Sequence, residues 1–301
     1  MSVTGKFLRA VKSAAAVLAV MATPAAAVDV NSTDYFPLPP GTNVFVSYTN
    51  FTTRNEFRVS PGGTSLRDSA LDSSVEILRF IRYIDIAGFT VAPQVLIPFG
   101  GLYNGKLGGA PLDHAAGFGQ PILATPVWLV NNTDTRTFLA VTPYVFLPIG
   151  NYRAGETLNL SENRWKFNPQ IGFVQETLDK TFLLQLTGDA IFYGSNNDAT
   201  AVGYGHLTQK DSYQFQGWLS YSPLVDQTWR FAVGYSQMWG GVQMLNGVRN
   251  GAATKSQQIR FEVSKFLAPD LQLLGEVSHD LSVTGGYKQD FVGLVRLVKL
   301  W

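Results

Sequence analysis

The segment from Ser212 to Trp239 reads S-Y-Q-F-Q-G-W-L-S-Y-S-P-L-V-D-Q-T-W-R-F-A-V-G-Y-S-Q-M-W, and large side chains alternate with small or polar ones along it. From Trp229 to Tyr235 every odd position is apolar, which is the period of a β-strand with one apolar face. The first half alternates in the same way, and a short link joins the halves. The segment therefore predicts a hairpin. Its aromatic residues lie near the strand ends, as in the girdles of membrane barrels.

The composition excludes several classes of protein. Charged residues make up 15% of the chain, well below the roughly 25% of a typical soluble domain, while aromatic residues make up 13%. The net charge of +1 gives no electrostatic basis for a nucleic-acid partner. The absence of cysteine excludes disulfides and thiolate chemistry.

Residues 1–27 have the pattern of a cleaved signal peptide. Three basic residues precede an apolar run from Ala14 to Met21, and Ala25-Ala26-Ala27 forms a small-residue exit. The apolar run is shorter than the ~20 residues that a membrane-spanning helix needs, which argues against an N-terminal anchor. We therefore expect export, with the mature chain beginning at Val28.

The rest of the chain divides into an arm and a barrel. Residues 28–42 are proline-rich and unperiodic, which predicts an extended periplasmic arm or plug segment, and residues 43–301 form the predicted β-barrel domain. Each predicted strand is long enough to cross a bilayer when tilted, since ~9–11 residues suffice. The twelve predicted strands are 43–51, 73–83, 87–97, 119–131, 137–149, 163–177, 181–194, 212–222, 228–239, 256–266, 271–281 and 288–300.

The links between these strands alternate in length. Those near 52–72, 98–118, 150–162, 195–211 and 240–255 are long and rich in Gly, Asn, Asp and Ser, whereas the intervening ones are short, the first being Ile84–Ile86. Long and short links in alternation, with an even strand count, are typical of an outer-membrane barrel. The sequence therefore predicts an all-β fold, a transmembrane antiparallel up-and-down barrel of about twelve strands, in the outer membrane of a Gram-negative bacterium.

The polar face of the later strands predicts the lining of the lumen. A charged side chain that faces lipid at mid-depth costs ~2–4 kcal/mol, so charges within strands belong inside the barrel. We expect these polar side chains to line a path for solute. They are Lys166, Gln170, Asp189, Arg230, Arg260, Glu262, Glu276 and Asp280.

Two features fit a regular barrel less well. Pro93, Pro126, Pro143 and Pro169 fall within predicted strands, where each removes a ladder donor, so bulges or different strand boundaries are required. The third to fifth strands are apolar on both faces. The lumen beside them is expected to be apolar or covered, for which the 28–42 arm is available.

Catalytic and metal sites have little support. His114, His206 and His279 are far apart in sequence and have no ligand spacing, so no metal and no cofactor is expected. In Ser278-His279-Asp280, the alternation places the histidine on the opposite face from its neighbours, and the chain contains no G-x-S-x-G elbow. Glu262 and Glu276 could form a carboxylate dyad, but an ion-pair network with Arg230 and Arg260 is the simpler interpretation. The chain is not expected to be an enzyme.

The last strand ends at Trp301 and resembles the aromatic C-terminal signal that the barrel-assembly machinery reads, although Lys299 departs from that pattern. The expected partners are therefore this machinery, outer-membrane lipid and a small-molecule solute.

Several strings along the chain are distinctive. They are L-P-P-G-T-N from Leu38, I-L-R-F-I-R-Y-I-D-I-A-G-F-T-V-A-P-Q-V-L-I-P-F-G from Ile77, A-T-P-V-W-L-V-N from Ala124, T-P-Y-V-F-L-P-I-G-N-Y from Thr142, N-L-S-E-N-R-W-K-F from Asn159, G-D-A-I-F-Y-G from Gly188 and G-Y-S-Q-M-W-G-G from Gly234. In this order they resemble the family of MetA-pathway phenol-degradation proteins. The resemblance implies an outer-membrane barrel associated by name with aromatic-compound degradation and often described as a transporter; it supplies no site residues.

These observations favour a passive channel or transporter for small aromatic or otherwise hydrophobic molecules. About eight strands leave an interior filled by side chains and 16–18 leave an open aqueous channel, so twelve predict a narrow pore. Two alternatives remain open: a structural or adhesion barrel with a plugged lumen, and a barrel hydrolase.

Overall fold

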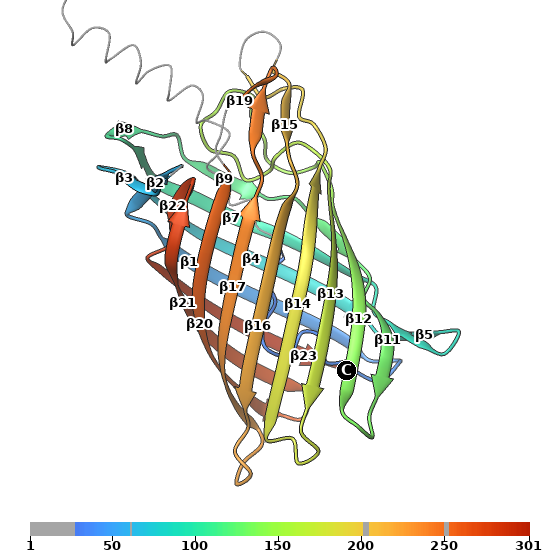
Figure 1. Ribbon diagram of the computed structural model, residues 1–301. Coiled ribbons are helices and arrows are strands. Elements are labelled where there is room, and N and C mark those ends of the chain that lie inside the picture. The colour runs from blue at the N-terminus through green and yellow to red at the C-terminus, as the bar shows by residue number, and fades with distance from the viewer. Residues whose placement is uncertain (1–27, 61, 201–204, 250–252) are drawn as a thin grey trace, which may run out of the picture.

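The computed structural model describes residues 28–60, 62–200, 205–249 and 253–301, and the predicted signal peptide at 1–27 lies outside these residues. Twelve antiparallel strand positions form a closed barrel (Figure 1), with β10 and β11 sharing one position. The wall strands are β1 (Asn43–Thr53), β4 (Ala70–Arg82), β7 (Gln94–Leu107), β10 (Ile122–Ala124) with β11 (Val127–Asn132), β12 (Thr137–Phe146), β13 (Lys166–Glu176), β14 (Phe182–Tyr193), β16 (Ser212–Tyr221), β17 (Trp229–Gly240), β20 (Thr254–Ala268), β21 (Leu271–Thr284) and β23 (Phe291–Leu300).

The barrel closes where the first strand meets the last. β1 pairs with β23 over ten positions, from Val44 opposite Leu300 to Thr53 opposite Phe291. Closure leaves no sheet edge exposed to lipid, where unpaired backbone groups would be costly. Among the described residues, no helix is long and apolar enough to cross a membrane.

The two ends of the barrel differ. One end, called here the long-loop end, carries small extra strands and lies at the top of Figure 1. The other, the short-turn end, carries the tight links and both Thr42 and Trp301; the Trp301 backbone N–H donates to the Asn43 carbonyl at 3.1 Å. The extra strands of the long-loop end are β2 (Glu56–Val59), β3 (Thr64–Leu66), β8 (Ala110–Pro111), β9 (Ala115–Phe118), β15 (Leu207–Gln209), β18 (Gln243–Leu245), β19 (Val248–Arg249) and β22 (Gly286–Lys288).

The predicted third strand, 87–97, and the short link before it, 84–86, are wrong. The structure forms a small hairpin instead, with β5 (Ile84–Ile86) paired to β6 (Phe89–Val91), and the wall strand β7 begins at Gln94. Ala87 and Gly88 have φ of 53° and 84°, and positive φ at both central residues is the requirement of a type I′ turn. The apolar residues of this stretch therefore pair with one another, and the glycine-rich 98–107 stretch continues the wall.

The four prolines are accommodated in two ways. Pro93 lies just before β7, and Pro126 lies in the break between β10 and β11. Pro143 and Pro169 stay within β12 and β13 and lie directly opposite each other. Because the two prolines are paired, both missing backbone N–H donors fall at the same point of the hydrogen-bond ladder between β12 and β13.

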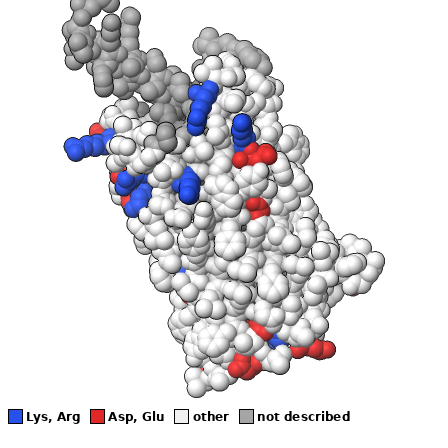
Figure 2. Space-filling view, in the orientation of Figure 1, with Lys and Arg blue, Asp and Glu red and all other residues white. Residues whose placement is uncertain are grey.

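The outer face is apolar and has an aromatic belt at each end. Figure 2 shows Lys, Arg, Asp and Glu gathered toward the two ends of the visible face, with an uncharged band between them. Phe261 and Ile171, at 53% and 50% exposure, are typical of this band. The ring pairs are Tyr213–Trp239 and Phe167–Phe192 toward the long-loop end and Phe182–Tyr221 and Trp229–Phe231 toward the short-turn end.

The interior is filled partly by the segment before β1. Val30 and Tyr35 of residues 28–42, called here the arm, are 1% and 3% exposed and belong to one apolar cluster with Trp128, Phe138 and Val174 of the wall. The arm therefore covers the part of the lumen wall that has no polar face.

Candidate functional site: the lumen, its arm and a vestibule

Polar wall side chains hold the backbone of the arm. The Trp218 indole N–H donates to the Val30 carbonyl at 2.9 Å, and the Gln216 amide accepts from the Val30 N–H at 3.1 Å. Gln185 both donates to the Asn31 carbonyl and accepts from the Tyr35 N–H, at 2.8 and 3.1 Å. These bonds supply the partners that an extended segment lacks when it lies outside a sheet.

Two glycines of the barrel wall make room for two aromatic side chains, Tyr35 of the arm and Trp218 of the wall. An added Cβ at Gly172 would lie 2.2 Å from the Tyr35 ring, and one at Gly234 would lie 2.6 Å from the Trp218 ring. Both distances are far below van der Waals contact. The Tyr35 hydroxyl is placed between Thr142 and Gln170, at 3.0 and 2.8 Å. These small wall residues thus leave the space in which the arm packs.

A buried ion pair underlies the arm. Arg260 donates to Glu276 through Nε and NH2 at 2.8 and 2.9 Å, and its Cζ lies 4.6 Å from the centroid of the Trp218 ring. The Asn31 amide donates to Glu276 at 2.8 Å and to Glu262 at 3.1 Å, and the Ser32 hydroxyl also donates to Glu262. The arm and Arg260 together give hydrogen-bond partners to two buried carboxyl groups, which would be costly to bury without them.

A second ionic contact involves Asp34 of the arm. Its carboxylate accepts from Arg296 at 2.7 Å and from Arg79 at 3.4 Å. Arg79 also donates to Gln94 and Tyr48, at 2.6 and 2.8 Å. Asp34 thus joins the arm to β23 and β4 on either side of the closing strand β1.

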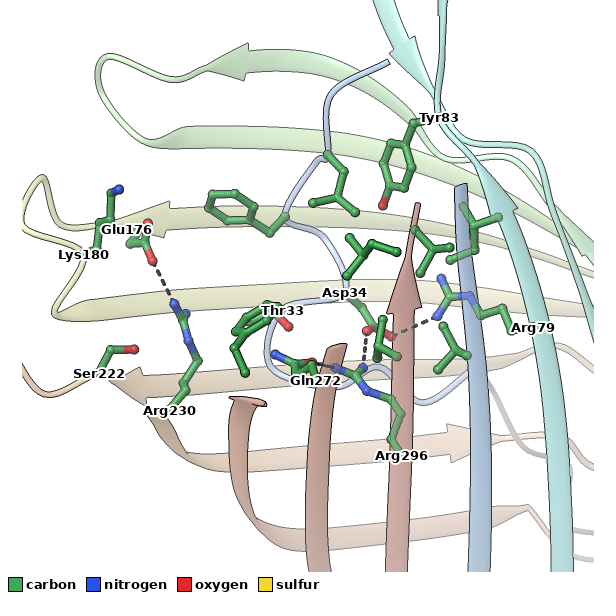
Figure 3. A pocket seen from close by; sticks show the side chains of 18 of the residues that line it. Thr33, Asp34, Arg79, Tyr83, Glu176, Lys180, Ser222, Arg230, Gln272 and Arg296 are labelled. Atoms are coloured by element: carbon green, nitrogen blue, oxygen red, sulfur yellow. Dashed lines mark hydrogen bonds and ion pairs between the residues drawn. The ribbon is translucent and has the colours of Figure 1, made fainter. Parts of the chain in front are cut away.

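Below the arm, at the short-turn end, lies a cavity of about 320 Å³, called here the vestibule (Figure 3). One part of its wall is apolar, with Phe36 and Leu38 of the arm facing Ile81, Val298 and Leu300. Among the described residues that line it, five side chains are cationic and two are anionic: Arg79, Arg136, Lys180, Arg230 and Arg296, against Asp34 and Glu176. The vestibule therefore combines an apolar wall with excess positive charge.

Glu162 and Asp280 are held by local partners near the long-loop end. Glu162, which precedes β13, forms ion pairs with Lys166 at 2.6 Å and with Arg164. Burial raises the pKa of Glu162, but the charges of Lys166 and Arg164 outweigh it and lower that pKa to about 2. Asp280 accepts from the Gln289 N–H at 2.7 Å and from the Gln258 amide at 3.3 Å.

The structure places the eight predicted lumen residues inside the barrel but does not bring them into one site. Arg260, Glu262 and Glu276 lie together under the arm. Gln170 donates to Asp189 at 2.8 Å beside Tyr35. Lys166 and Asp280 lie toward the long-loop end, and Arg230 lies in the vestibule. The predicted network of both arginines with Glu262 and Glu276 thus holds for Arg260, whereas Arg230 binds Glu176 at 3.0 Å.

Sequence reasoning missed several charged residues of the lumen. Arg79 and Arg296 are buried at 9% and 4% exposure, and a buried arginine requires a carboxylate, which Asp34 of the arm supplies. Arg136 and Lys180 fall in short turns, where a solvent-exposed position is the usual expectation, yet both line the vestibule.

The remaining candidates for chemistry stay apart. The His279 ring is exposed and contacts the Asp290 carbonyl at 2.6 Å, whereas its neighbours Ser278 and Asp280 are 6% and 4% exposed and face the lumen. Across the described part of the chain, no group of three His, Cys, Asp or Glu residues could hold a metal ion.

The sequence and the fold have clear relatives. The model of the family described as "Putative MetA-pathway of phenol degradation" matches residues 54–296. The chain belongs to this family. Among solved structures, this MetA-pathway family member is similar to the COG4313 outer membrane channel from Pseudomonas putida F1, at 30% sequence identity and a TM-score of 0.84, over 91% of this chain and 100% of that chain.

More distant barrels share only the architecture. The translocator domain of autotransporter NalP from Neisseria meningitidis matches at 10% identity and a TM-score of 0.50, over 89% of this chain and 91% of that chain, which shows the fold alone. No curated protein matches the sequence. The barrel and its channel relative place the MetA-pathway family member in the outer membrane of a Gram-negative bacterium, and no family of enzymes is indicated.

Proposed function

We propose that the chain is a passive uptake channel for small hydrophobic or aromatic molecules, with the arm as its plug. The proposal is supported by the family and by a relative that is an outer membrane channel. Short turns of outer-membrane barrels lie in the periplasm, so the short-turn end and its vestibule face inward to the cell. Residues 1–27 act in this proposal as the export signal and 28–42 as the plug.

The vestibule is the observation that carries the proposal. A purely structural barrel gains stability by filling its lumen, and an aqueous porin needs a continuous polar channel. This lumen is filled at mid-depth, where the arm lies, and keeps a cavity of about 320 Å³ below it, with Phe36, Leu38 and Leu300 in its wall. A cavity of this size, mainly apolar with a few polar groups, is typical of a site for one small molecule.

Passage requires the arm to shift. Part of its contacts are hydrogen bonds to neutral wall side chains such as Gln185 and Gln216, whereas the ion pairs of Asp34 hold it more firmly. A typical hydrogen bond contributes only about 0.5–1.5 kcal/mol net, because water replaces the lost partner. The path would run along the polar lumen wall, past Gln170, Asp189 and Arg260, into the vestibule.

The test is uptake of N-phenyl-1-naphthylamine, a neutral aromatic dye that brightens in lipid and that an intact lipopolysaccharide leaflet excludes. Cells that express the protein should accumulate the dye several times faster than cells that carry an empty vector. A second culture that expresses an unrelated barrel of equal abundance controls for general leakiness. Equal rates in all three cultures would reject the channel and favour the plugged structural barrel, for which the filled mid-lumen is the supporting observation.

A further inference from the structure

We propose that the vestibule is a binding site for an amphipathic monoanion, a small organic acid with one carboxylate and an apolar body. This inference rests on the proposed function, because it names the solute class that the channel would receive. It rests structurally on a cationic cluster, called here the rim cluster, formed by Arg136, Glu176, Lys180 and Arg230 at the short-turn end.

The rim cluster has more donors than its single carboxylate can accept. Arg136 donates through Nε and NH2 to the same Glu176 oxygen, and Arg230 donates through NH2 to the other oxygen at 3.0 Å. A guanidinium carries five N–H donors. In the described part of the chain, Glu176 is the only carboxylate that pairs with either arginine. One carboxylate thus serves two guanidinium groups, and Lys180, which lies beside Glu176 in Figure 3, adds a third positive charge.

The other two cations of the vestibule, Arg79 and Arg296, share the Asp34 carboxylate and leave one positive charge in excess, and Arg296 also donates to Asn31 and Gln272, both at 3.1 Å. The rim cluster leaves two, so most of the excess charge is located at the rim. The side chains of Arg136 and Arg230 are 18% and 20% exposed there, so an incoming anion can reach them.

An apolar surface lies next to these cations. The Arg136 Cζ is 5.0 Å from the centroid of the Phe36 ring, which places the cation and the apolar wall in direct contact. Leu38, Val298 and Leu300 continue that wall within the same cavity. A carboxylate at the rim would bring an attached ring or short chain against this surface.

The arrangement binds other solutes less tightly. A cationic amphiphile is repelled by the rim, and a neutral hydrocarbon can pass but gains no contact with the guanidinium donors. A small hydrophilic anion leaves the apolar wall hydrated. Only a molecule with both features uses the whole cavity. Glu176 takes the place of that carboxylate while the site is empty and would compete with it.

This competition gives a test that separates binding from a structural role. The full protein is reconstituted in phosphatidylcholine nanodiscs and titrated calorimetrically with 1-naphthoate and with neutral 1-naphthalenemethanol, with empty nanodiscs as the blank. The wild type should bind 1-naphthoate about tenfold more tightly than the alcohol, in line with one charge-assisted bidentate contact. Arg230→Gln should remove that preference, and Glu176→Gln should tighten naphthoate binding about threefold.

The matched control is Lys265→Gln. Lys265 lies near the same end of the barrel but on the outer face, 4.4 Å from the centroid of the Trp229 ring, so its loss should leave both affinities unchanged. Lys180→Gln provides a second rim variant if Arg230→Gln does not fold. Heat-modifiable gel mobility verifies that each variant is a closed barrel.

Equal affinity of the wild type for both probes would overturn the proposal. So would a Glu176→Gln variant that binds naphthoate as weakly as Arg230→Gln, because that result means that the cluster only holds the structure together. Failure of the channel itself is distinct: dye uptake would be absent while naphthoate still binds. Conversely, dye uptake without a preference for naphthoate would support the channel and contradict the anion site.

Discussion

The lumen contains arginine–glutamate ion pairs in two different surroundings. Under the arm, Arg260 and Glu276 are both 4% exposed, and the arm completes the shell around them. At the vestibule rim, Arg230 is 20% exposed and shares Glu176 with Arg136. In the first arrangement the arm and Arg260 provide the carboxylates with hydrogen-bond donors from within the protein, whereas the second leaves donors in excess. The comparison teaches that the surroundings of an arginine–carboxylate pair, more than the pair itself, decide whether its donors are all used within the protein.

The largest expected effect is on stability. Arg260→Ala should lower the free energy of unfolding by about 3–5 kcal/mol, because it leaves Glu276 buried without its cation. Arg230→Ala should cost less than about 1 kcal/mol, since the pair is partly exposed and Arg136 remains. Equilibrium urea unfolding in lipid vesicles measures both values. Similar losses of unfolding free energy for the two variants would contradict the difference between the two ion pairs.

The second prediction concerns the wall position against which the arm packs. Gly172→Ala should cost about 1–3 kcal/mol, because the new Cβ overlaps the Tyr35 ring and the arm must move. Single-channel conductance in planar bilayers should rise as the arm is displaced. Gly188→Ala is the control, since a Cβ there meets nothing within 4 Å. Unchanged conductance in Gly172→Ala would show that the arm does not limit the pore.

The third prediction sharpens the contrast at the rim. Arg230→Glu should raise the cation-to-anion permeability ratio about threefold, because two units of charge change in a confined passage where screening is incomplete. Reversal potentials under a salt gradient give this ratio. The outward-facing Lys265→Glu should leave it unchanged. Arg260→Glu is unsuited to the measurement, since it would place a third carboxylate beside Glu262 and Glu276.

The smallest effect is confined to the long-loop end. The pKa of Glu162 is lowered from its ordinary value of 4.5 to about 2, so its stabilising contribution is full above pH 4.5 and is lost as the pH falls toward 2. The protection of the Glu162–Lys166 backbone amides against hydrogen exchange, taken relative to the intrinsic rate at each pH, should fall over that range. Glu162→Gln should show low protection at every pH, and a wild type with constant protection would contradict the prediction.

Much of the barrel could be predicted from the sequence, because lipid on one side and water or protein on the other impose a period of two. Strands such as β16 and β17 were predicted within one or two residues of their observed bounds. The stretch 84–107 was not, since the positive φ of Ala87 depends on turn geometry that strand periodicity does not report.

The contacts inside the lumen were harder to predict from the sequence. Alternation predicts that Arg260 and Glu262 point inward, but it cannot say which residues of distant strands meet. Arg230 was assigned to the wrong carboxylate because the tilt of the strands sets its height relative to Glu176. The contacts of the arm, such as Asp34 with Arg296, have no period at all and depend on how the closed barrel is filled.

The contact between Asp34 and Arg296 also bears on the order of assembly. Asp34 precedes the first strand, and Arg296 lies on the last one, which pairs with β1 to close the barrel. The set of contacts that holds the arm is thus incomplete until the final residues of the chain arrive. Closure of the wall therefore also completes the ionic contact of the arm, and an open intermediate holds its arm without the Arg296 contact until the last strand pairs.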